Sequence, residues 1–362
     1  MQEARVTAAP TTHRFDDTTY ARWQRAEGVP IYTGSFVEDL HTAEVAVWPR
    51  VGQKGALVSL AEQQQDDGWL IEIAPGGKTE VLHHIFEACV YVVEGRGATT
   101  FWQEGGAKQT VEWETGSLFS PPLNCFYQHF NLDGARPTRV YHATTASMMM
   151  NIFKSEKAVF NSPQVFDDRY DGAEDYWSAN QRLTTRLWET NLVPDLRTFQ
   201  LDDAPGRGAA NRSMAFSMAG NGMGAHMSEF ESGTYKKAHR HGPGAHLIIL
   251  TGSGFSLIWR EGQPRTKVDW HEGTLFSPTD QAYHQHFNTG PEPARYLAFT
   301  FSHMIVKSRS ALYGSDVSER EGGWQIEYVD EDPEIYDIWA SECARNGAAV
   351  KQPRGYRAAA AV

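Results

Sequence analysis

The sequence predicts an all-β protein built from two copies of one fold. Residues 157 positions apart match without a gap over a large part of the 362-residue chain. Within each copy, short segments rich in β-branched and aromatic residues are separated by glycine or proline at intervals of roughly 8–12 residues. Examples are AHLIIL, GFSLIW and RYLAFTFS. Such spacing is typical of β-sandwiches and β-barrels. We expect the two copies to span residues 37–145 and 193–302.

The repeat is carried by glycines, by tryptophans and by two short blocks. The first copy has Gly76, Gly95, Gly97, Trp102, Trp113 and Gly116 where the second has Gly233, Gly252, Gly254, Trp259, Trp270 and Gly273. The blocks Leu118-Phe119-Ser120-Pro121 and Gln128-His129-Phe130-Asn131 recur as Leu275-Phe276-Ser277-Pro278 and Gln285-His286-Phe287-Asn288. Matches of this number and order indicate an internal duplication.

Helices are expected outside the two copies. Residues 146–192 are predicted to form a helical linker, with a candidate helix over 175–189 (DYWSANQRLTTRLWE). Residues 303–347 are predicted to form a C-terminal extension with a helix over 331–347, because Pro333 stands near a first turn and Gly347 near a stop.

Composition excludes several classes of protein. The formal net charge of −12 argues against nucleic-acid binding, which needs a basic face. The sequence contains no run of about eighteen apolar residues, so no membrane span is predicted. The first residues lack the apolar core of a signal peptide, and the three cysteines form no CxxC pair. We therefore expect a cytoplasmic protein without a disulfide framework.

Five histidines in the second copy are the main candidate site. His239, His241 and His246 lie in AHRHGPGAH, and His284 and His286 lie in YHQHFN. Residues two apart on a strand point to the same face, so each closely spaced pair should project together. Two such pairs meeting inside a barrel could hold a metal ion through neutral imidazole nitrogens. The alternative is a set of hydrogen-bonded core histidines, which would each need a buried partner.

The two copies act as controls for each other. His241 and His286 have histidine counterparts, His84 and His129, so either could belong to the scaffold. The other three histidines are specific to the second copy: His239, His246 and His284 are replaced in the first by Leu82, Cys89 and Tyr127. We expect the first copy to be metal-free, although His83, His84, Glu87 and His129 could form a poor site of their own.

The motifs of the second copy resemble those of the cupins. Gly233, His239, His241 and Gly252 follow the first cupin motif, with His246 in the place of its glutamate. The second motif is matched by Gly273, Pro278, His284 and Asn288, with the proline one place early and the inner glycine absent. Because both copies take part, the resemblance implies a bicupin: two jelly-roll barrels from an internal duplication.

Among cupins, AHRH and YHQHFN look like ring-cleaving dioxygenases of the gentisate and salicylate type. That resemblance implies Fe(II) held by three histidines, with the later histidine of the HxH pair lining the substrate pocket. The sequence departs from that type in two respects. The richer site here is in the C-terminal copy rather than the N-terminal one, and His246 takes the place of a glutamate.

These considerations give a ligand set of His239, His241 and His284, with His246 as a candidate fourth. Strand parity cannot separate His284 from His286, but the family motif and the copy comparison favour His284. His286 is expected either to support the ligands and act in catalysis, or to be the second-motif ligand in place of His284. Lys237 lies two residues before His239 and should point to the same face of the strand. Lys237, Arg240 or Arg260 is expected to hold a substrate carboxylate.

The resulting hypothesis is a non-haem Fe(II) dioxygenase that binds O2 and a small anionic substrate, either a hydroxy-carboxylate or a hydroxylated aromatic. An oxygen-independent lyase, isomerase or decarboxylase using Mn, Ni or Zn is the first alternative. A small-molecule-binding bicupin without turnover is the second. A homo-oligomer is expected, with neither nucleic acid nor membrane as a partner.

Overall fold

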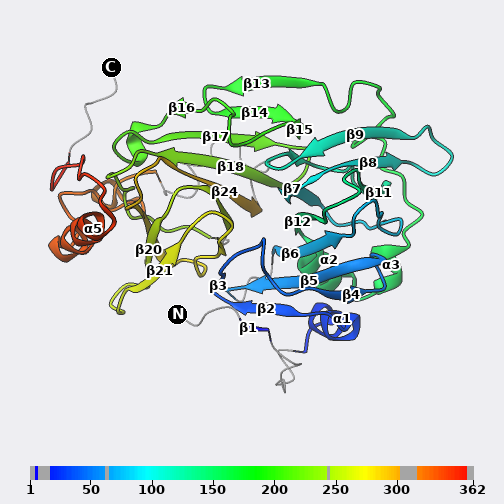
Figure 1. Ribbon diagram of the computed structural model, residues 1–362, viewed down its shortest axis with the longest axis horizontal. Coiled ribbons are helices and arrows are strands. Elements are labelled where there is room, and N and C mark those ends of the chain that lie inside the picture. The colour runs from blue at the N-terminus through cyan, green and yellow to red at the C-terminus, as the bar shows by residue number, and fades with distance from the viewer. Residues whose placement is uncertain (1–4, 7–16, 62–64, 243–244, 302–315, 357–362) are drawn as a thin grey trace.

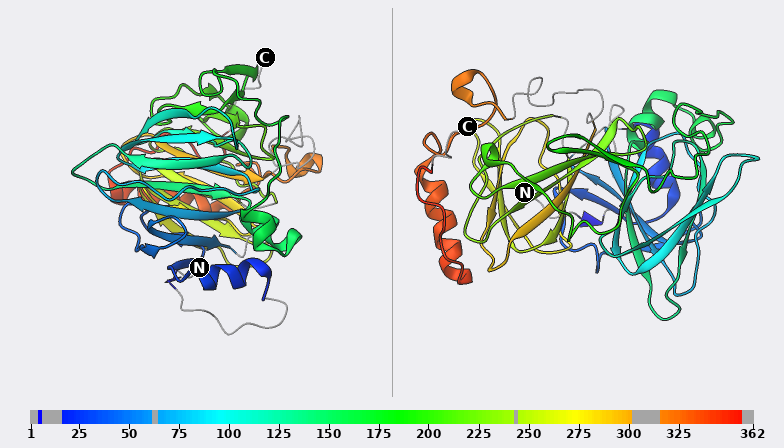
Figure 2. Two further views of the ribbon diagram at one scale, coloured as in Figure 1. Left: turned by 90° about the vertical axis from the view of Figure 1, so that its right-hand side faces the viewer. Right: turned by 90° about the horizontal axis from the view of Figure 1, so that it is seen from above.

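The computed structural model describes residues 5–6, 17–61, 65–242, 245–301 and 316–356. Its strands form two large sheets and two small ones, arranged as two barrels side by side (Figures 1 and 2). Each barrel is a large sheet facing a three-stranded sheet across a hydrophobic core. The all-β jelly-roll prediction is confirmed.

The large sheet of the N-terminal barrel runs, in order, through β1 (Arg5–Val6), β2 (Ile31–Gly34), β5 (Gln53–Leu60), β6 (Asp67–Ile73), β12 (Thr138–Thr144), β7 (Ala88–Glu94), β10 (Leu118–Phe119) and β15 (Leu192–Val193). Strand β4 (Ala46–Trp48) pairs with β5. The small sheet has the order β11 (Phe126–Asn131), β8 (Arg96–Trp102) and β9 (Gln109–Glu114). Neighbouring strands are antiparallel except for β2 and β5, which pair in parallel.

The C-terminal barrel repeats this order. Its large sheet contains β13 (Asn180–Thr184), β14 (Leu187–Thr190), β17 (Arg212–Ser217), β18 (Met223–Phe230), β24 (Ala294–Phe301), β19 (His246–Thr251), β22 (Leu275–Phe276) and β3 (Phe36–Val37). Strand β16 (Asp202–Asp203) pairs with β17, and β14 pairs with β17 in parallel. The small sheet has the order β21 (Thr266–Trp270), β20 (Gly254–Trp259) and β23 (Tyr283–Asn288).

The two large sheets pack against each other, which explains their nearly continuous apolar sequences. On β7, Val90 and Val92 enter the core of the N-terminal barrel, whereas Tyr91 and Val93 enter the core between the barrels. A strand buried on both faces needs apolar residues at successive positions. The alternating polar pattern of a half-exposed strand is therefore absent from β7 and from β19.

Each copy lends its first residues to the other barrel. Strand β3 pairs with β22, and β15 pairs with β10. We call residues 36–43 the N-terminal strap and residues 192–199 the C-terminal strap. The two straps are fixed alike: the Leu40 amide donates to the Gly273 carbonyl, and the Leu196 amide donates to the Gly116 carbonyl, both at 2.9 Å. The barrels are thus joined by reciprocal strand exchange.

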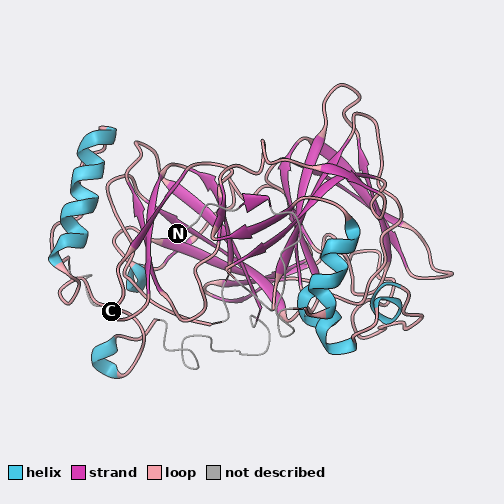
Figure 3. Cartoon of the chain, turned by 90° about the horizontal axis from the view of Figure 1, so that it is seen from below, coloured by secondary structure: helices cyan, strands magenta, loops and turns pink. Residues whose placement is uncertain are grey.

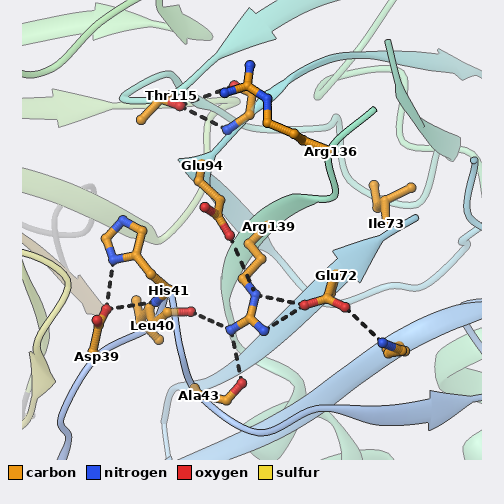
Figure 4. A network of polar contacts seen from close by, with 12 residues as sticks. Asp39, Leu40, His41, Ala43, Glu72, Ile73, Glu94, Thr115, Arg136 and Arg139 are labelled. Atoms are coloured by element: carbon orange, nitrogen blue, oxygen red, sulfur yellow. Dashed lines mark hydrogen bonds and ion pairs between the residues drawn. The ribbon is translucent and has the colours of Figure 1, made fainter. Parts of the chain in front are cut away.

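An arginine holds each strap, Arg139 being buried and Arg295 half-buried. The Arg139 guanidinium donates to the carbonyls of Leu40 and Ala43, at 2.9 Å each, and pairs with Glu72 at 2.6 Å (Figure 4). In the second copy, Arg295 binds the carbonyls of two residues in the C-terminal strap and pairs with Glu229. An arginine with five fixed donors can satisfy a carboxylate and two carbonyls together.

The helices lie at the two ends of the molecule (Figure 3). They are α1 (Thr19–Glu27), α2 (Ala146–Phe153), α3 (Glu156–Phe160) and α5 (Pro333–Asn346), with 3₁₀ turns η1 (Pro205–Arg207) and η2 (Glu319–Glu321). The C-terminal helix prediction is confirmed: Asp332 caps α5, Pro333 opens it, and Gly347 ends it with a φ of 71°. None of the described helices is long and apolar enough to span a membrane.

The prediction of a helix over 175–189 was wrong, and the linker is helical only in its first part. These residues form a turn followed by the hairpin of β13 and β14. Tyr176 is buried in the N-terminal core and donates its hydroxyl to the Ser120 carbonyl, which anchors the turn. Strand β14 then joins the large sheet beside β17, so tertiary pairing overrides the helical pattern. Residues 302–315, where the C-terminal extension was predicted to begin, lie outside the described residues.

Helix α5 covers the outer face of the small C-terminal sheet (Figure 2). Trp339, Ile335 and Cys343 pack there with Phe255 and Phe287. This packing fixes which side of β23 faces outward, and so it places the alternate residues, His284 and His286, toward the barrel interior.

Candidate functional site

Three of the predicted ligands come together in the C-terminal barrel. His239, His241 and His284 each offer a nitrogen, and these nitrogens lie within 4.8 Å of one another. The ring centroids of His239 and His284 are 4.2 Å apart, and His239 and His284 face each other in an antiparallel bridge. His239 and His284 are buried, whereas His241 is half-buried. This is the only such group of potential ligands found in the described part of the chain.

Hydrogen bonds set the tautomers of two of these rings. His284 Nδ1 lies 3.1 Å from the Ala282 carbonyl, and His239 Nδ1 lies 3.4 Å from the Lys237 carbonyl. A carbonyl oxygen only accepts, so Nδ1 carries the proton in both rings. In a neutral ring Nε2 then keeps its lone pair, which is the state a metal ligand requires. The residues present therefore fit a divalent metal ion.

The electrostatics favour neutral imidazoles. Burial holds the pKa of His239 well below its usual range, and the nearby Arg207 guanidinium lowers the pKa further. The guanidinium donates to His239 Nε2 and also pairs with Asp316 at 3.1 Å and with Gln325 at 3.2 Å. A metal ion at Nε2 would take the place of this hydrogen bond, and the guanidinium would then lie beside the metal, able to meet an anion.

His286 has the opposite tautomer. Trp270 donates its indole N–H to Ser256 Oγ at 3.0 Å, and Ser256 Oγ lies 2.8 Å from His286 Nδ1. Among the described residues Nδ1 is the one acceptor beside the Ser256 hydroxyl, so the serine donates its proton to Nδ1, and Nε2 of His286 carries the ring proton. Trp113, Thr99 and His129 form the same chain in the first copy. His286 is thus part of the shared scaffold and presents an N–H rather than a ligand lone pair.

A β-bulge corrects the prediction for Lys237. Tyr235 is bridged to Phe287, and His239 is bridged to His284. Between these two bridges the chain advances by four residues on one strand and by three on the other. The extra residue reverses side-chain parity between Lys236 and His239. Lys236 therefore points inward beside His286, whereas the Lys237 ammonium pairs with Glu327 at 2.7 Å. The side chain of Lys237 thus points away from the histidine cluster, contrary to the direction expected from its position two residues before His239.

Arg240 also points away from the histidine cluster. Its position between His239 and His241 turns its side chain to the opposite face, where the guanidinium lies 4.8 Å from the Tyr283 ring centroid. It also lies 3.7 Å from the exposed carboxylate of Glu261. Arg240 therefore covers an aromatic ring on the outer face of the barrel.

His246 is not a fourth ligand. On β19, Leu247 and Ile249 face the core of the C-terminal barrel, whereas Ile248 and Leu250 face the core between the barrels. His246 shares the parity of Ile248, and its Nδ1 lies 2.6 Å from the Tyr141 hydroxyl of the N-terminal barrel. The prediction failed because a continuous apolar strand gives no sign of which alternate residues face which core.

The first copy places Leu82, His84 and Tyr127 where the second has its three histidines. Leu82 and Tyr127 are bridged as His239 and His284 are. Both His84 nitrogens are occupied: Nδ1 donates to the Phe86 carbonyl at 2.9 Å, and Nε2 accepts from the Tyr127 hydroxyl at 2.7 Å. Leu82 supplies no donor atom, so these three positions offer a metal no facial set.

Three functional candidates were missed from the sequence: Arg207, Lys236 and Tyr296. Arg207 ends a 3₁₀ turn about thirty residues before His239 and belongs to no motif, so the sequence carried no signal for it. Lys236 was one residue away from the predicted lysine, and only the bulge distinguishes the two. Tyr296 lies on β24, where it faces inward with its ring centroid 5.1 Å from that of His286.

Buried neutral histidines predict acid sensitivity. Burial lowers the pKa of His84 and His129 to about 3 and that of His246 to about 4. Unfolded histidine titrates near 6.5, so below about pH 6.5 the unfolded chain binds protons that the folded chain excludes. Each such histidine should reduce the free energy of unfolding by on the order of 1.4 kcal/mol per pH unit. Asp66 and Asp67, whose pKa values burial raises, act in the opposite direction and offset part of the loss.

We therefore expect the midpoint of urea unfolding to fall between pH 7 and pH 5. The variant His129→Gln should show a shallower fall, because it removes one of the groups that titrates. An equal or higher midpoint at pH 5 would contradict the assignment of these rings as neutral.

The fold and the site together define a duplicated jelly roll with a candidate metal centre in its second copy. No family model and no curated protein sequence matches the chain. Solved structures do match. Oxalate decarboxylase from Lactobacillus farciminis is similar with a TM-score of 0.50 and 12% identity, over 73% of this chain and 85% of that one.

A mutant of Bacillus subtilis oxalate decarboxylase is similar with a TM-score of 0.52 and 11% identity, over 83% and 85% of the two chains. Salicylate 1,2-dioxygenase from Pseudaminobacter salicylatoxidans has a TM-score of 0.47 and 13% identity, over 66% and 71%. At such identities the likeness to the oxalate decarboxylases concerns the fold alone. The fold of this chain is that of a bicupin, as its motifs indicated.

Proposed function

We propose that the protein is a metal-dependent enzyme, a non-haem Fe(II) dioxygenase acting on a small anionic substrate that carries a hydroxy-carboxylate or a hydroxylated aromatic ring. The observation that carries the proposal is the cluster of His239, His241 and His284, with their nitrogens within 4.8 Å and no carboxylate among them. Three neutral ligands leave the full charge of a divalent ion in place and favour an anionic partner.

The residues of the chain would have the following roles. His239, His241 and His284 would hold the ion, with Nδ1 of His239 and His284 anchored on backbone carbonyls. Bound Fe(II) would supply open coordination positions for substrate and O2 side by side. His286 would present its Nε2–H beside them, kept in that tautomer by Ser256.

Two cations support an anionic substrate. The Arg207 guanidinium lies against His239, and the Lys236 ammonium lies on the inner side near His286. Both raise the positive potential around the histidines, because the low dielectric of the barrel interior strengthens charge interactions. A hydroxyl group bound in this field would release its proton more easily.

The same site with Mn, Ni or Zn could support an oxygen-independent reaction. Oxalate decarboxylases share the fold, and one fold hosts many chemistries. The distinction between the two reaction classes lies in the use of O2, and it can be measured directly.

The test is oxygen uptake by protein reconstituted anaerobically with Fe(II). Salicylate, gentisate and 2-hydroxy acids such as malate would be supplied in turn, and uptake would be followed with an oxygen electrode. Uptake with a one-to-one loss of substrate is the expected result. Substrate loss without O2, with Mn, Ni or Zn, would replace the dioxygenase with a lyase, isomerase or decarboxylase. Binding of these compounds without turnover would favour a non-catalytic binding protein.

A further inference from the structure

Lys236 is a buried cation without a carboxylate. The residue is 2% exposed, and its ammonium donates to Ser228 Oγ at 3.0 Å and to the Tyr296 hydroxyl at 2.6 Å. Among the described residues, no carboxylate forms an ion pair with it. Arg207, Lys237 and Arg295 each have a carboxylate partner in the same barrel. An unpaired buried charge is costly, which makes Lys236 exceptional among these cations.

The duplication shows that the fold does not require this group. Lys236 donates its backbone N–H to the His286 carbonyl, as Thr79 does to the His129 carbonyl in the first copy. Ser228 pairs directly with Tyr296, and the corresponding pair in the first copy is Ile71 and Val140. The lysine, serine and tyrosine are thus replaced by threonine, isoleucine and valine in a barrel with the same strand order.

Lys236, Ser228 and Tyr296 form a polar group that lies next to the histidine cluster. The ring centroid of Tyr296 is 5.1 Å from that of His286, and the ring centroid of His286 is 5.6 Å from that of His284. The polar group and the three-histidine cluster therefore occur in the same barrel and on the same interior face. Burial lowers the pKa of Lys236, and an anionic ligand beside it would stabilise its charged form.

We infer that Lys236, with Tyr296 and Ser228, forms a subsite for a second acidic group of the substrate, so that the substrate class is a hydroxylated dicarboxylate. The inference rests on the proposed metal site: one carboxylate and its neighbouring hydroxyl would meet the metal, and the other carboxylate would meet the Lys236 ammonium. Tyr296 and Ser228 hold the ammonium in place, and the lysine has a third N–H to donate.

The test compares pairs of ligands that share the same metal-binding end. Malate has one more carboxylate than lactate, and 2-hydroxyterephthalate has one more than salicylate. Binding would be followed by the visible spectrum of the Co(II)-loaded protein and by calorimetry. We expect the dianion of at least one pair to bind ten- to a hundredfold more tightly than its partner. In Lys236→Met that preference should disappear, while the affinity for the monoanion changes less than threefold.

Two matched variants serve as controls. Thr79→Met alters the equivalent position of the first barrel, and Lys237→Met removes the neighbouring cation that faces outward. Both should keep the preference for the dianion. Thermal melting would show that each variant is folded.

The possible failures are distinguishable. Absence of Co(II) binding in wild type would remove the proposed metal site itself. Normal Co(II) binding with no preference for either dianion would overturn the subsite alone, and this result needs no variant. A preference that survives in Lys236→Met would likewise overturn the assignment to Lys236.

Discussion

Replacing His239 or His284 by alanine is expected to reduce the metal content from about one ion per chain to less than about a tenth of that value. Loss of a residue that only orients a ligand typically costs 10–100-fold in metal affinity, and loss of one of three ligands should cost more. The measurement is elemental mass spectrometry on anaerobically purified protein, covering iron, manganese, nickel and zinc.

Three other histidines provide controls for this experiment. His246→Ala should keep the metal, because His246 faces Tyr141 between the barrels. His84→Ala alters the counterpart of His241 in the first copy and should keep it as well. His286→Gln should keep it because Nε2 of His286 carries a proton. Loss of metal in His246→Ala would mean that the ring leaves its interface to become a ligand, contrary to the structure.

Replacing Arg139 by alanine is expected to lower the free energy of unfolding by about 3–5 kcal/mol, the range for breaking a buried ion pair. The change removes the side-chain donor of the Leu40 and Ala43 carbonyls and leaves the Glu72 carboxylate paired only with the exposed Lys54, at 3.1 Å (Figure 4). Arg295→Ala removes the same contacts in the second copy and should have an effect of similar size. Urea unfolding followed by tryptophan fluorescence would measure both.

The control for this prediction is Arg136→Ala. Arg136 pairs with Asp133, but its side chain is 80% exposed, and exposed ion pairs contribute about 0–1 kcal/mol. A small effect of Arg139→Ala, equal to that of Arg136→Ala, would show that the N-terminal strap is not held by this guanidinium.

The sequence was informative where a pattern is set by the chain itself. The duplication predicted two barrels because glycines and tryptophans at matched spacing occupy equivalent turns and cores, such as Trp113 and Trp270 in their hydrogen-bonded chains. The cap residues Pro333 and Gly347 predicted the last helix, because both act within one turn of the backbone.

The sequence failed where position depends on a distant contact. Parity placed His239, His241 and His284 correctly, but it failed for Lys237, because one bulged residue reverses every side chain beyond it. Strand parity also failed for His246. Both faces of β19 are buried in apolar cores, so the apolar residues of this strand do not indicate which face points into the C-terminal barrel. Arg207 reaches the site through tertiary structure alone, and no local pattern records that.

The exchanged straps also govern the order in which the protein can be completed during translation. The strand that finishes the first large sheet, β15, leaves the ribosome only after the whole linker has been made. Until then β10 of the nascent first barrel is an unpaired edge strand. The N-terminal strap is also unpaired, because its partner β22 belongs to the barrel that has not yet been synthesised. An unpaired edge is a template for intermolecular pairing. A chain that ended after the first copy could close that edge only with the strap of another molecule, so the duplication converts what would be assembly between chains into folding within one chain.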